Sequence, residues 1–110
     1  MAENPSDEAS KEKLQLLLFQ LGETLKDPPV VIDIYSWRDS VEVIMEEIQK
    51  VSPYAYNMLE DLITETVRIA NIHVSDLDRD APPNEIEQSS MKYFEQVAFV
   101  NSEINNLKSM

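Results

Sequence analysis

The chain contains no cysteine, a single histidine and a single glycine, and these absences exclude several kinds of site at once. Without cysteine there can be no disulfide, no thiolate metal site and no cysteine nucleophile. One histidine, His73, is too few for a histidine metal cluster, and we expect it to pack at the end of a helix. One glycine, Gly22, is too few for a glycine-rich phosphate loop. We therefore expect a protein that is not an enzyme and needs no cofactor.

Long apolar runs and clusters of basic residues are missing as well. The apolar block over residues 14–21 is too short to span a bilayer, and the polar start of the chain does not resemble a secretory signal. We therefore expect a cytoplasmic protein. The chain has 21 acidic and 9 basic side chains, which gives a formal charge of −12. This charge opposes binding to nucleic acid and to acidic membranes, because phosphate recognition needs clustered Lys and Arg.

Apolar residues recur at alternating steps of three and four in four stretches of the chain. The first of these stripes is Leu14, Leu18, Leu21 and Leu25. Such spacing places the listed side chains on one face of a helix, where four stripes can bury one another. The sequence predicts an all-α fold, a small four-helix bundle that is mostly antiparallel and forms a single domain over residues 8–110. Helices are predicted over residues 7–26, 37–51, 53–74 and 85–108.

The segments outside these helices are less clearly specified. Residues 1–7 are predicted to be a flexible acidic tail. Pro28 and Pro29 end the first helix, and residues 30–35, VVIDIY, are β-prone. We interpret this segment as an extended link across the bundle, with an intermolecular strand pair as the alternative. Ser52 and Pro53 start the third helix directly after the second, so that a tight corner and one long kinked helix both stay open.

A set of carboxylates between the third and fourth helices has the spacing of a calcium-binding loop. The candidate ligands fall at positions 1, 3, 5 and 12 of an EF-hand pattern and are Asp76, Asp78, Asp80 and Glu87. Two residues depart from this pattern, because Ala81 stands where the turn needs glycine and Pro83 stands two positions later. Asn84 and Glu87 also form a capping-box pattern for the fourth helix. A calcium-responsive helical module is therefore an alternative function.

The first helix and the segment after it carry more apolar residues than one stripe requires. Leu16 and Phe19 lie off the stripe, so that they favour contact with another chain. Our leading hypothesis is a non-enzymatic protein–protein interaction module: a small acidic adaptor, chaperone-like factor or inhibitor. We expect a homodimer and a protein partner with a basic surface; an enzyme built from carboxylates between subunits ranks third. The predicted interaction residues are Leu14, Leu16, Phe19, Val30, Ile32 and Ile34.

Overall fold

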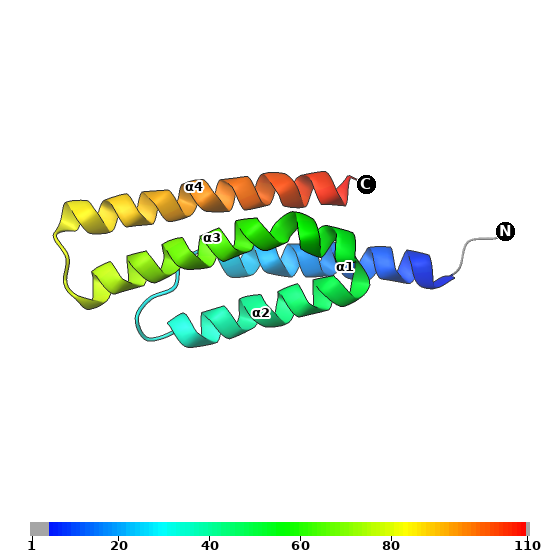
Figure 1. Cartoon of the computed structure of the whole chain (residues 1–110), viewed down its shortest axis with the longest axis horizontal. Coiled ribbons are helices and arrows are strands. Elements are labelled where there is room, and N and C mark those ends of the chain that lie inside the picture. Colours follow the sequence, from blue (N-terminus) through cyan, green and yellow to red (C-terminus); the bar gives the residue numbers. More distant parts are fainter. Residues whose placement is uncertain (1–4, 110) are drawn as a thin grey trace.

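The computed structural model describes residues 5–109, which form four α-helices and no strand within that range (Figure 1). Each helix is antiparallel to the one before it, and α1 packs on α2 and α4 while α3 packs on the same two helices. The helices therefore close a ring around one core, and the predicted all-α bundle is confirmed. None of the described helices is long and apolar enough to cross a membrane. The helices are α1 (Pro5–Leu25), α2 (Ile34–Val51), α3 (Pro53–Asp78) and α4 (Pro83–Lys108).

The core consists largely of the predicted stripes. Leu18 and Leu21 of α1 are fully buried, as are Ile48 of α2 and Leu59 of α3. The core also contains polar side chains, and Thr66 of α3 is fully buried. The Leu62 carbonyl oxygen accepts two hydrogen bonds, one from the Thr66 hydroxyl at 2.7 Å and one from the Gln96 side-chain amide at 3.1 Å. A buried polar position is tolerated in this way because its hydrogen bonds are satisfied within the bundle.

The junction between α2 and α3 is a tight antiparallel corner. Ser52 has extended backbone angles, φ −150° and ψ 93°, which interrupt the helical path between Val51 and Pro53. The Ser52 hydroxyl accepts a hydrogen bond from the Ala55 N–H at 3.1 Å, so that it caps the start of α3. Of the two arrangements that the sequence leaves open, the structure has the corner.

The prediction of an extended segment over residues 30–35 is wrong. Residues 31–33 form a turn, and Ile34 and Tyr35 are the first residues of α2. The Asp33 carboxylate accepts the Val30 N–H at 2.8 Å, and the Asp33 carbonyl accepts the Trp37 N–H at 2.9 Å. An extended segment would have no partner strand for its backbone groups within the described chain, whereas these hydrogen bonds satisfy them locally.

Several helix boundaries differ from the predicted ones. Residues 5–7 of the predicted tail belong to α1, while residues 1–4 lie outside the described residues. The third helix continues to Asp78, beyond the predicted end at Val74. The fourth helix begins at Pro83 after Pro82, so that the predicted capping box at Asn84 does not form. Proline is favoured at the first position of a helix because its missing N–H would have no helical partner there, and this preference decides where α4 begins.

Two aromatic side chains bind the carbonyl groups at the end of α1. The Trp37 Nε1–H donates to the Thr24 carbonyl at 3.1 Å, and the Tyr93 hydroxyl donates to the Leu25 carbonyl at 2.7 Å. The two rings are neighbours, with centroids 6.3 Å apart. The last carbonyls of a helix need partners from outside it, and the prolines at 28 and 29 have no N–H to offer. Side chains of α2 and α4 therefore close the end of α1.

We expect Tyr93→Phe to lower the free energy of unfolding by about 1–3 kcal/mol, because it removes the hydroxyl and leaves the buried Leu25 carbonyl without a donor. Urea unfolding followed by circular dichroism measures the change. Tyr54→Phe is the matched control, since Tyr54 is 53% exposed, and its effect should stay within about 0.5 kcal/mol. Equal effects of the two substitutions would contradict the role given to Tyr93.

Candidate interaction surface

The six predicted interaction residues divide into an exposed group and a core group. Leu14 is half-buried against the core, and Ile34 is only 8% exposed. For Ile34 the prediction is wrong, because the turn before it starts α2 with this side chain facing inward. Leu14 also contributes to the core. The exposed members are Leu16, Phe19, Val30 and Ile32.

Leu16 and Phe19 lie on the outer face of α1, each 56% exposed. They are one turn apart and belong to a second stripe with the same spacing as the core stripe, on the opposite side of the helix. This outer stripe consists of Glu12, Leu16, Phe19 and Glu23 of α1 and of Lys26, the residue directly after the helix. All five side chains are exposed, so that α1 presents to solvent an apolar centre with charged residues on both sides.

A groove of about 610 Å³ runs between α1 and α4 beside this stripe. Phe19 and Gly22 line it from α1, and Phe94 lines it from α4. A Cβ atom added at Gly22 would have the Asn101 Oδ1 as its nearest neighbour, at an ordinary contact distance of 3.6 Å. Glycine in the interior of a helix lowers the stability of the helix by about 1 kcal/mol relative to alanine. The packing of α1 on α4 therefore does not require glycine at this position.

The turn after α1 forms a second exposed apolar area. Ile32 is 92% exposed, the highest value among the large apolar side chains of the described chain. The hydrogen bonds of Asp33 hold this turn in one conformation. Sequence reasoning missed two of its members, Val31 and Tyr35, although both are part of the VVIDIY segment. We call Val30, Val31, Ile32 and Tyr35 the turn surface.

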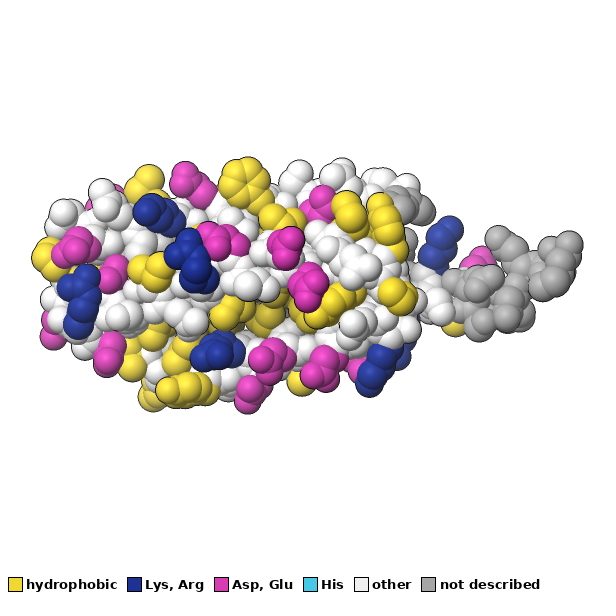
Figure 2. Space-filling model, viewed as in Figure 1, with side chains coloured by type: hydrophobic (Ala, Val, Ile, Leu, Met, Phe, Trp, Pro, Cys, Tyr) yellow, Lys and Arg dark blue, Asp and Glu magenta, His cyan; other side chains and the backbone are white. Residues whose placement is uncertain are grey.

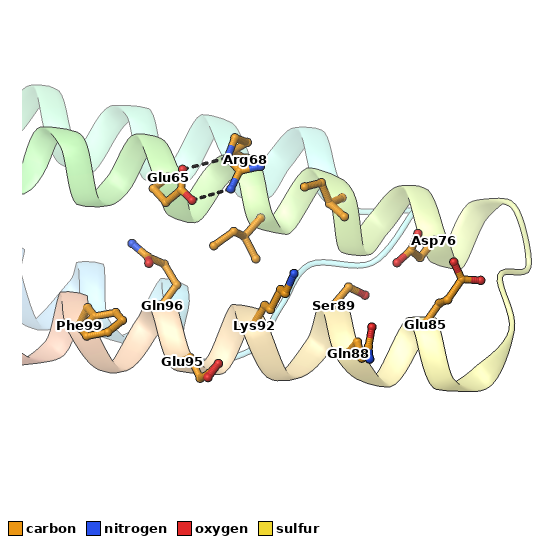
Figure 3. Close-up of a pocket in the computed structure, with 12 residues that line it drawn as sticks. Glu65, Arg68, Asp76, Glu85, Gln88, Ser89, Lys92, Glu95, Gln96 and Phe99 are labelled. Carbon is orange, nitrogen blue, oxygen red and sulfur yellow. Dashed lines mark hydrogen bonds and ion pairs between the residues drawn. The ribbon is translucent and has the colours of Figure 1, made fainter.

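Acidic side chains are spread over the rest of the molecule. Figure 2 shows them along the face formed by α2, α3 and α4, with Lys and Arg interspersed and not gathered into one patch. A groove of about 560 Å³ between α3 and α4 has four carboxylates and two cations along its walls. One cation, Arg68, forms two hydrogen bonds to Glu65, and the other, Lys92, projects from α4 toward α3 (Figure 3).

The predicted calcium ligands are not brought together. Asp76 and Asp78 belong to the last turn of α3 and Glu87 to α4, while Asp80 lies between them with a positive φ of 51°. The Asp76 carboxylate is bound by the Arg79 guanidinium at 2.9 Å. The continuation of α3 to Asp78 removes the loop that the EF-hand pattern requires. Within residues 5–109 there is no group of three or more metal-ligating side chains.

His73 forms a buried hydrogen bond between α3 and α4. Its Nδ1 lies 2.9 Å from the Ser89 hydroxyl oxygen, and that hydroxyl donates to the Ile86 carbonyl at 3.0 Å. In this arrangement the Nδ1–H of His73 is the donor to Ser89, so that the neutral ring is satisfied. Burial lowers the pKa of His73 below its usual 6.5, and the charge of Asp76 opposes this shift. The side chain therefore packs at the end of α3 as a neutral group.

Comparison of the chain with protein-family models, with curated proteins and with solved structures gave no match. The structure itself contains two exposed apolar areas, the outer stripe with its groove and the turn surface.

We expect Gly22→Ala to raise the free energy of unfolding by about 0.5–1 kcal/mol, because alanine is the better helix former and the added methyl group has room. Urea unfolding at low protein concentration measures this. A loss of stability would show that α1 and α4 approach more closely than the 3.6 Å contact indicates.

The lowered pKa of His73 predicts a dependence of stability on pH. The unfolded chain takes up the proton first, so that the stability contributed by neutral His73 is complete above about pH 6.5 and decreases as the pH falls toward the lower pKa of the folded protein. His73→Gln removes this term. Urea unfolding near neutral pH and near pH 5 should therefore show a larger acid-induced loss for the original chain than for His73→Gln. Parallel losses would contradict the prediction.

Proposed function

We propose that the protein is a non-enzymatic interaction module, a small acidic adaptor or inhibitor that works by binding another protein. The observation that carries this proposal is the turn surface, where large apolar side chains face solvent on a turn held by Asp33. Burying a side chain of this kind fully contributes about 1.5–3 kcal/mol. A partner that covers the turn surface gains this energy at a turn whose backbone groups are already hydrogen-bonded within the chain.

Charge supports a partner with a basic surface. The chain carries a formal charge of −12, and its carboxylates are distributed over the visible face of the bundle (Figure 2). Such a field accelerates the encounter with a basic protein and repels acidic ones, and salt weakens both effects. A cytoplasmic location is part of the same proposal.

Site-specific photocross-linking tests the proposal. A photoreactive residue replaces Ile32 in the full chain, and the matched control places it at Ser102, which is also exposed and lies on α4. In extracts of the source cells, position 32 should give a discrete adduct that position 102 does not give. The yield should decrease from low to physiological ionic strength, because screening weakens the attraction.

The adduct is then identified, and its binding to purified chains is measured directly. Ile32→Ser together with Tyr35→Ser should weaken binding at least about tenfold, since central apolar anchors dominate interface energies. Identical adducts from positions 32 and 102 would contradict the turn surface as the binding site. Binding that does not depend on salt would contradict the basic partner.

A further inference from the structure

The packing within a single copy of the chain does not explain why residue 22 is glycine. It lies in the interior of α1, where glycine is less stable than alanine, and its nearest potential neighbour in α4 would be at an ordinary contact distance. Glycine elsewhere in helices marks places where another chain segment approaches closely. Gly22 is half-buried and faces the groove between α1 and α4 that Phe19 also lines. A closely packed neighbour outside the monomer would account for this glycine.

The outer stripe is complementary to itself when two copies of α1 lie antiparallel. If the two Phe19 side chains meet on a two-fold axis, Leu16 lies level with Gly22 of the second copy along the helix axis, since both are three residues from Phe19. Glu12 and Lys26 each lie seven residues from Phe19, so that each Glu12 faces Lys26 of the second copy. One register thus brings a large apolar side chain level with the glycine and pairs opposite charges with each other, twice in the dimer.

The charge of the grooves between α1 and α4 also fits this arrangement. The two grooves along this boundary are lined by Lys11, Lys26 and Lys108, with Glu23 as the single carboxylate. The groove between α3 and α4 has the opposite balance, four carboxylates to two cations. Two molecules that each carry a charge of −12 repel one another on most faces. Along the boundary between α1 and α4, the lysines can attract the carboxylates of a second copy.

We propose that the outer stripe of α1 binds the same stripe of a second copy of this chain, antiparallel and centred on Phe19. The assignment rests on the proposed function, because it names the partner of one of the two exposed apolar areas. In this dimer Phe19 and Leu16 are buried between the two α1 helices, and Leu16 lies level with Gly22 of the other copy. Glu23 of the second copy comes to lie opposite Gln15, beside Lys108, which lines the same groove as Gln15.

Charge reversal tests both the partner and the register. Neither Glu12 nor Lys26 forms an ion pair within the described part of the chain. The two residues are also about 21 Å apart along α1, too far to interact within one copy. Glu12→Lys and Lys26→Glu should each weaken self-association about tenfold, since two attractive contacts become repulsive. The double variant should restore the original affinity, because the pairs are re-formed with their signs exchanged.

Sedimentation velocity of the full chain, from micromolar to near-millimolar concentration, measures the association. Asp61→Lys and Lys92→Glu are the matched controls, as exposed charges on α3 and α4, and should leave the dimer unchanged. Phe19→Ser should abolish the dimer, whereas Phe99→Ser, at a side chain that is 64% exposed, should not. Gly22→Ala should weaken the dimer while its helix remains intact by circular dichroism.

Three results would overturn the proposal. The first is a monomer at every concentration, and the second is a double charge variant that associates no better than the single ones. The third is a photoreactive residue at position 19 that captures a different protein while the chain itself stays monomeric. None of these results affects the cross-linking at position 32, so that the two proposals fail independently.

Discussion

The carbonyl groups at the end of α1 constrain the rest of the structure. Prolines follow the helix and provide no N–H, so that the Thr24 and Leu25 carbonyls are bound by the indole of Trp37 and the hydroxyl of Tyr93. These two donors come from α2 and α4, the neighbours of α1 in the ring. Burial raises the pKa of the Tyr93 hydroxyl, which keeps its proton in place as a donor. One pair of aromatic side chains thus joins the end of α1 to both helices that pack against it.

The sequence predicts the bundle well because helical periodicity alone decides which side chains face inward. Local signals failed where residues close to them in the sequence competed with them. The β-branched residues of the VVIDIY segment favour an extended chain, yet Asp33 satisfies the backbone locally and Ile34 turns into the core. Likewise, the capping box at Asn84 is displaced by the prolines before it. In the first case a neighbouring carboxylate satisfies the backbone, and in the second the preference of proline for the first helical position decides where α4 begins.

The candidate surface was predictable only in part. The exposure of Leu16 and Phe19 follows from their place off the core stripe. The outer stripe from Glu12 to Lys26 was visible in the spacing as well, but its meaning depends on knowing that this side of α1 faces solvent. The groove shared with Phe94 could not be predicted, because it depends on how closely α1 approaches α4. The distribution of lysines along that boundary likewise emerges only when α1 and α4 are placed side by side.

Trp37 is the only tryptophan of the chain, and it lies, nearly buried, against Tyr93 with its indole N–H bound to the end of α1. Its fluorescence therefore originates from a single known place. The emission of an indole depends on the polarity around it, and here that environment exists only while α1, α2 and α4 are joined. The fluorescence of Trp37 thus reports, without any added label, whether α1 is packed against α2 and α4.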